Sequence, residues 1–186
     1  ADEFKIHHNI TLDVIQNGVD TEVFYPLKSE DKYRLRKKLN LPQDKKIFIS
    51  VGALIPRKDM LTVIRGFKNR GIENTYLLIA GIGDEYRNLL KITNKDKNIV
   101  LLGNVSNVSE YMQASDYFIS ASWAEGLPNT VLEAMACKLP VLLSSIKPHK
   151  EVFETVPDYP YFFEIRNYEA LASEINLIVQ ENYSVI

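Results

Sequence analysis

Residues 46–81 read KIFISVGALIPRKDMLTVIRGFKNRGIENTYLLIAG, and this stretch decides the fold. The nearly continuous apolar runs at 46–52 and 75–81 are typical of strands that are buried on both faces of a parallel sheet. Between them, the apolar residues of 59–69 recur at helical spacing, and Asp59 stands where an N-cap belongs. The stretch therefore predicts a strand, a helix and a second strand.

The same alternation continues along the chain. Further strand-like runs follow at 98–103, 116–120, 140–144 and 161–165, and helical stretches at 85–93, 108–114, 129–138, 148–155 and 167–181. We therefore expect an α/β fold, a Rossmann-like parallel sheet with helices on both faces and right-handed crossovers. Ligands bind such sheets at the carboxyl ends of the strands, so the loops there are where chemistry is expected.

Composition excludes several classes of protein. The chain has 186 residues, a formal net charge of −2 and 46% hydrophobic residues, which fits one globular domain and excludes a disordered or fibrous chain. The near-neutral charge argues against a nucleic-acid partner. No apolar run approaches the ~20 residues of a membrane span, and charged residues interrupt 1–20, unlike a signal peptide. The single cysteine, Cys137, is interpreted as a packing residue rather than a nucleophile.

A basic stretch, 28–46, precedes the first strand. One interpretation is a solvated helix, and the other is attraction to an anionic membrane or to a phosphate-bearing acceptor. The histidines His7, His8 and His149 are not expected to form a metal site. His149 is expected on the surface, with a position lining the cleft as the alternative.

The most informative loop, 122–136, follows a strand and opens a helix. Gly126 is expected to give the turn its backbone freedom, Pro128 to occupy the first helical position, and Asn129 or Thr130 to cap. The unpaired N–H groups of 127–130 would then form a phosphate site at the helix N-terminus.

Two glutamates belong to this loop and its helix. Glu133 lies within the helix, where a buried carboxylate needs partners and a ribose diol supplies two hydroxyl donors. Glu125 precedes the helix, from where it could reach hydroxyls of a group on the far side of the phosphates. Trp123, beside Glu125, is expected either in the core, at the site or at a domain interface.

Glu125 and Glu133, within EGLPNTVLEAMACKLPV, resemble the signature of the retaining, nucleotide-sugar-dependent glycosyltransferases of family 4, which have the two-domain GT-B fold. Residues 51–59, VGALIPRKD, are similar to the family's glycine-rich loop, in which an Arg and, five residues on, a Lys hold the donor diphosphate. Lys58 matches the Lys. Ala53 takes the place of the Arg, and Arg57 is near enough to supply the missing charge.

Three shorter segments extend the resemblance. Residues 15–20, IQNGVD, look like the family's segment between its two domains, and 80–85, AGIGDE, like its turn after the second strand. Residues 102–105, LGNV, look like the loop whose backbone contacts the nucleotide base. Plain tight turns remain the alternative for the glycines of these loops.

The resemblance implies a donor-binding domain that holds a nucleoside diphosphate sugar of the UDP or GDP type, with no metal and no other cofactor. Glu125 would contact the donor sugar, and proton transfer would fall to the leaving phosphate. The donor-binding residues would be Gly52, Arg57, Lys58, Gly83, Asn104, Val105, Gly126, Leu127, Pro128, Asn129, Thr130 and Glu133.

The resemblance also implies a second, N-terminal acceptor domain. The chain begins at Ala1 without a methionine, so we expect that domain to be absent from it. Residues 1–26 would be an interdomain segment and lead-in, and 27–186 the donor-binding domain. The full-length protein would be a bacterial, cytoplasmic hexosyltransferase of polysaccharide or glycoconjugate synthesis, with peripheral contact at the inner face of the membrane left open. This half alone would be inactive.

Two other functions stay open. A nucleotide-binding or regulatory domain without catalysis is the first, because Ala53 replaces the expected Arg. A dehydrogenase-type dinucleotide domain is the second, but it requires a fuller glycine-rich fingerprint than the one at 80–85.

Overall fold

The computed structural model describes residues 18–93, 96–154 and 161–181. Its centre is a six-stranded parallel sheet with the strand order β3-β2-β1-β4-β5-β6, so the predicted parallel α/β fold is confirmed. The strands are β1 (Lys46–Val51), β2 (Thr75–Ala80), β3 (Ile99–Gly103), β4 (Tyr117–Ser120), β5 (Val141–Ser144) and β6 (Phe162–Phe163). The expected strand at 161–165 is thus only two residues long.

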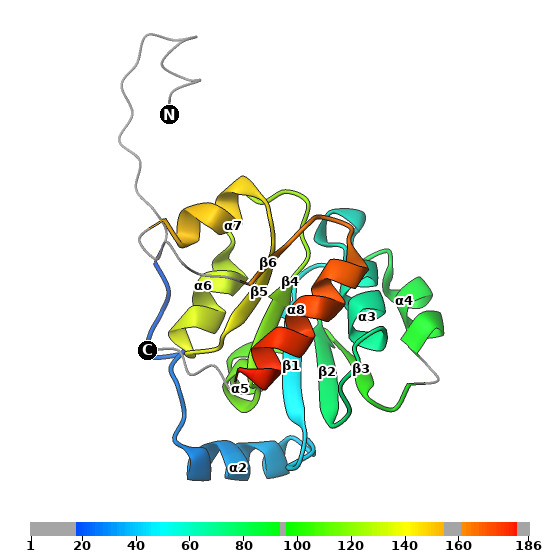
Figure 1. Ribbon diagram of the computed structural model, residues 1–186. Coiled ribbons are helices and arrows are strands. Elements are labelled where there is room, and N and C mark those ends of the chain that lie inside the picture. The colour runs from blue at the N-terminus through cyan, green and yellow to red at the C-terminus, as the bar shows by residue number, and fades with distance from the viewer. Residues whose placement is uncertain (1–17, 94–95, 155–160, 182–186) are drawn as a thin grey trace, which may run out of the picture.

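Helices alternate with the strands and cover both faces of the sheet (Figure 1). They are α2 (Ser29–Lys38), α3 (Met60–Lys68), α4 (Tyr86–Thr93), α5 (Val108–Ala114), α6 (Asn129–Ala136), α7 (Lys147–Val152) and α8 (Tyr168–Gln180), with a 3-10 turn η1 at Pro56–Lys58. Helices α3, α4 and α8 contribute to the core on one face, and α5 and α6 to the core on the other.

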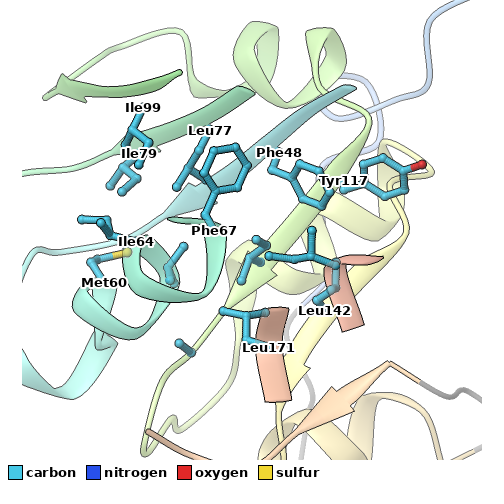
Figure 2. Packing of buried hydrophobic residues seen from close by; sticks show 14 of the residues in the cluster. Phe48, Met60, Ile64, Phe67, Leu77, Ile79, Ile99, Tyr117, Leu142 and Leu171 are labelled. Carbon is cyan, nitrogen blue, oxygen red and sulfur yellow. The ribbon is translucent and has the colours of Figure 1, made fainter. Parts of the chain in front are cut away.

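The first core is built around aromatic side chains (Figure 2). The ring of Phe48 stacks on that of Tyr117 with centroids 4.6 Å apart, and Phe67 from α3 meets Phe48 edge-on at 5.9 Å. Leu171 of α8 belongs to the same cluster. Because β1 and β4 carry these rings, the two strands that lead into the informative loops are fixed at the middle of the molecule.

The predicted helix in the basic stretch is present as α2, but it is not simply solvated. Asp116 accepts hydrogen bonds from Lys32 (2.8 Å), from Arg36 (2.7 Å) and from the backbone N–H of Ile47 (2.8 Å). Arg36 is buried, and Lys38 pairs with Glu110. The solvated interpretation therefore holds for most of α2, including the exposed Lys38, but it is wrong for Arg36 and incomplete for Lys32, which long-range contacts with Asp116 hold.

The lead-in segment is described only from Gly18 onward. Phe24 closes a turn on the carbonyl of Asp20 and packs against the second core, and Gln113 of α5 donates to the carbonyl of Val23. The predictions that concern His7, His8 and residues 15–17 lie outside the described residues.

Candidate functional site

A groove lies at the carboxyl ends of β1, β2 and β3, as expected for ligand binding by a parallel sheet. Its volume is about 180 Å³, and its lining includes Gly52, Asn104 and Val105, all predicted donor-binding residues. Gly81 also lines it at φ +145°, where an added Cβ would lie 1.9 Å from the carbonyl oxygen of Gly52. The two loops therefore meet backbone to backbone and leave a shallow groove.

Gly83, also a predicted contact, is placed differently. An added Cβ would lie 2.4 Å from the carbonyl oxygen of Leu54, and Gly83 is absent from the groove lining. Here glycine permits close packing of the loops after β1 and β2.

The loop after β1 places Lys58 beside the groove. Asp59 precedes α3 in the left-handed region at φ 46°, and its carboxylate accepts a hydrogen bond from the backbone N–H of Thr62 at 3.2 Å, so the predicted N-cap is confirmed. The Cδ and Cε atoms of Lys58 lie 3.5 Å from where a Cβ of Gly52 would stand. The lysine stem thus runs over Gly52, beside the groove.

Lys58, Arg57 and Glu125 form one ion cluster. The Nζ of Lys58 lies 2.5 Å from Oε1 of Glu125, and Nη1 of Arg57 lies 3.1 Å from Oε2. The exposed fraction of the side chain is 7% for Glu125, 17% for Lys58 and 46% for Arg57. Burial opposes ionisation of Glu125, but hydrogen bonds from Lys58, Ser122 and Arg57 hold its pKa below the ordinary value. The carboxylate is therefore charged at neutral pH.

The start of α6 differs from the expected capping. Pro128 is the N-cap and Asn129 the first helical residue, with no capping hydrogen bond from a side chain. The N–H of Asn129 donates to the carbonyl of Leu127 at 3.0 Å and that of Val131 to Pro128 at 2.9 Å, while proline has no N–H. Of 127–130, only Leu127 and Thr130 keep N–H groups without a backbone acceptor in the described structure.

Gly126 does not have the role expected for it. Its φ is not positive, and an added Cβ would meet nothing within 4 Å. The turn therefore does not require glycine, and open space lies beside the backbone of Gly126 before α6.

Glu133 lies half-buried on α6, and burial raises its pKa. No hydrogen bond or ion pair engages its carboxylate within the described residues. Burial, with a smaller effect from Glu133, raises the pKa of the Cys137 thiol to about 11. Cys137 is buried in the second core, in agreement with its interpretation as a packing residue.

The expectation for His149 is wrong in both of its forms, because the side chain is fully buried. Its Nδ1 lies 2.9 Å from the carbonyl oxygen of Ser144, and its Nε2 lies 3.4 Å from Oγ of Ser120. Burial lowers its pKa, so the ring is neutral. It packs α7 onto the ends of β4 and β5, a long-range contact that a lone histidine after a strand does not reveal.

Sequence reasoning missed Asp59 and Arg166 as neighbours of Trp123. The indole N–H of Trp123 donates to Oδ2 of Asp59 at 2.8 Å, and the guanidinium of Arg166 lies 3.7 Å from the centroid of the ring. These residues lie on three different loops, so no local pattern predicts that they meet.

Two further observations concern metals and membranes. In the described ranges, no group of three or more His, Cys, Asp or Glu side chains is arranged to hold a metal ion. No helix in the same ranges has the length and apolar character needed to cross a membrane.

Comparison with known proteins adds a family match. The family model described as "Glycosyl transferases group 1" matches residues 31–184. A relative from Escherichia coli, named UDP-Gal:alpha-D-GlcNAc-diphosphoundecaprenol alpha-1,3-galactosyltransferase, is 34% identical over 144 residues. That match covers 73% of this chain and 37% of the relative, so the chain spans well under half of the relative's length.

Solved structures share the fold. Anabaena HepE in complex with UDP-glucose superposes with a TM-score of 0.80 at 20% identity, over 91% of this chain and 48% of that one. The C-terminal domain of the group 1 glycosyl transferase LpcC from Francisella tularensis superposes with a TM-score of 0.72 at 22% identity, over 89% of both chains. The architecture is thus one found as a separate domain of larger proteins.

Proposed function

The chain belongs to the group 1 glycosyl transferases, and from this premise we propose that it is the donor-binding half of a retaining, family 4 hexosyltransferase. It binds a nucleoside diphosphate sugar, from which the full-length protein transfers the sugar to an acceptor. One observation carries the proposal. Two cations and a carboxylate, from loops 67 residues apart in the sequence, converge beside a groove at the carboxyl ends of the strands.

Lys58 and Arg57 bind the diphosphate in this proposal. Negative charge develops on that leaving group as the glycosidic bond breaks, so fixed cations stabilise the transition state. The N–H groups of Leu127 and Thr130, which have no backbone acceptor among the described residues, add donors at the start of α6. No cofactor is proposed, since these groups supply the positive charge that the departing diphosphate requires.

The two glutamates bind hydroxyl groups. Glu133 has a half-buried carboxylate without a protein partner in the described structure, and the two hydroxyls of a ribose satisfy it. Glu125 accepts hydrogen bonds from hydroxyl groups of the donor sugar. The base lies in the groove lined by Gly52, Asn104 and Val105.

The remaining features of the proposal concern the whole protein. An N-terminal acceptor domain precedes this half, with residues 1–26 as the interdomain segment, and this half alone is inactive. The UDP-type donor is favoured over the GDP type, because the names of the Escherichia coli relative and of the HepE complex contain UDP sugars. Several relatives are named for capsular, teichuronic acid or O-antigen synthesis, which supports a role in polysaccharide or glycoconjugate assembly. The cellular setting of this proposal is a bacterial cytoplasm, with contact at the inner face of the membrane left open.

A regulatory nucleotide-binding domain without catalysis is the second candidate, because Ala53 stands where the family has an arginine. Calorimetric titration with UDP, GDP and ADP tests the binding common to both candidates. We expect at least one of them to bind, and no binding of any at millimolar concentration by the folded chain refutes the proposal. Sugar release from the donor by the full-length protein separates the enzyme from the regulatory domain.

A further inference from the structure

The charged groups of the candidate site come from two separate loops. Lys58 and Arg57 belong to the loop between β1 and α3, and Glu125 belongs to the loop between β4 and α6. Long cationic side chains lose rotamer freedom when they are held in one geometry. Something must therefore hold the two loops in register for the cluster to persist.

Trp123 joins these loops by two hydrogen bonds. Its backbone N–H donates to the carbonyl of Arg57 at 2.9 Å, and its indole N–H donates to Oδ2 of Asp59 at 2.8 Å. Arg57 and Asp59 are the neighbours of Lys58 on either side. The two bonds therefore flank the lysine that pairs with Glu125.

The acceptor of the indole N–H is itself fixed. Asp59 is 7% exposed, and Oδ2 also accepts from the hydroxyl of Thr62 at 2.8 Å. On the other side, Arg166, in the turn between β6 and α8, lies over the indole ring. Trp123 is held from one side by the start of α3 and from the other by this turn.

We propose that Trp123 is a positioning residue of the donor site, which clamps the two loops so that Lys58 and Arg57 are already in place, beside Glu125, when the donor arrives. This inference rests on the proposed function. Preassembly removes the ordering cost from the binding step, and a displacement of these groups of about 1 Å weakens their action strongly.

The test compares Trp123→Phe with Thr62→Val in the chain as it stands. Each substitution removes one hydrogen bond to Oδ2 of Asp59. Only the first of these bonds crosses to the loop of Glu125, so Thr62→Val is the matched structural control. Phenylalanine keeps a ring under Arg166. Two readouts are taken: the pKa of the Glu125 carboxyl by carbon-13 NMR, and the affinity for UDP by calorimetry.

We expect Trp123→Phe to raise the pKa of Glu125 toward its ordinary value and to weaken UDP binding about three- to tenfold. Thr62→Val is expected to lower the melting temperature while leaving the Glu125 pKa and the UDP affinity unchanged. An unchanged Glu125 pKa in Trp123→Phe, or equal changes in the two variants, overturns the clamp.

Two further results are also decisive. If wild-type protein binds no nucleotide while Trp123→Phe still raises the Glu125 pKa, the clamp stands and the proposed function falls. If Trp123→Phe fails to fold, Arg166→Met is used instead, because it removes the contact on the ring of Trp123 and Arg166 is exposed. It should shift both readouts in the same direction by a smaller amount, and no shift in either refutes the clamp.

Discussion

Replacing Glu125 by glutamine should have opposite effects on stability and on nucleotide affinity. In the structure, the carboxylate of Glu125 pairs with Lys58 at 2.5 Å and with Arg57 at 3.1 Å. These are the cations that the proposal assigns to the diphosphate. A bound diphosphate must therefore compete with Glu125 and approach its negative charge. Glu125→Gln removes this competitor and its charge while keeping the size of the side chain. Trp123 still joins the two loops in this variant, so Lys58 and Arg57 stay in place, unlike in Trp123→Phe.

The expected loss of stability follows from burial. Removing one partner of a fully buried ion pair costs about 3–5 kcal/mol, whereas an exposed pair is worth about 1 kcal/mol or less. The side chain of Lys58 is 17% exposed and that of Arg57 is 46% exposed, and glutamine still accepts one hydrogen bond. We therefore expect a loss of about 2 kcal/mol, or a melting temperature lower by about 4–8 °C.

UDP affinity should rise about three- to tenfold, which corresponds to ~1 kcal/mol of relieved competition. Urea denaturation gives the free energy of unfolding, and calorimetry gives the affinity. Glu133→Gln is the matched control, with the same chemical change on α6 but without a cationic partner in the described structure. It should weaken UDP binding without a loss of stability, because burial already disfavours that carboxylate. If Glu125→Gln also weakens UDP binding, Glu125 does not compete with the diphosphate.

Three further outcomes are expected. Asp116→Ala should lower the free energy of unfolding by about 2–4 kcal/mol, because Lys32 and the buried Arg36 lose their shared carboxylate. Urea denaturation measures this loss. Burial opposes ionisation of Asp116, but these cations hold its pKa below the ordinary value. The difference between wild type and Asp116→Ala should therefore be complete above pH ~4 and shrink as the pH falls through the folded-state pKa; a pH-independent difference contradicts this. Gly81→Ala should cost more than about 2 kcal/mol, since φ is +145° and a Cβ would lie 1.9 Å from the Gly52 carbonyl oxygen. If this variant has the same melting temperature as wild type, the close approach of Gly81 to the carbonyl oxygen of Gly52 is refuted.

Much of the fold could be predicted because its signals are local. Apolar runs such as 46–52 match β1, and the spacing of Val63, Ile64 and Phe67 predicts the buried face of α3. Strand β6 is shorter than its apolar run predicts. Phe162 and Phe163 pair with β5 for only two residues, because strand length at the edge of a sheet depends on its neighbour as well as on composition.

The candidate site could be predicted only in part. The resemblance to the family singled out Lys58 and Arg57, the loop before the helix singled out Glu125, and the structure brings the three together. Their mutual ion pairing was not predicted, because it depends on contacts 67 and 68 residues apart in the chain. The burial of His149 was not predicted for the same reason, because its ring contacts Ser120 of β4 and Ser144 of β5, and Ser120 is 29 residues away in the chain.

The central claim is that the Lys58 loop binds the diphosphate while Glu133 binds the ribose. The most direct measurement is the calorimetric affinity of wild type, Lys58→Ala and Glu133→Ala for UDP and for uridine. We predict that Lys58→Ala weakens UDP binding at least about fivefold, as the loss of a charge-assisted hydrogen bond should, and leaves uridine binding unchanged. Glu133→Ala should weaken both ligands. UDP affinity that is unchanged in both variants would contradict the account and place the nucleotide elsewhere.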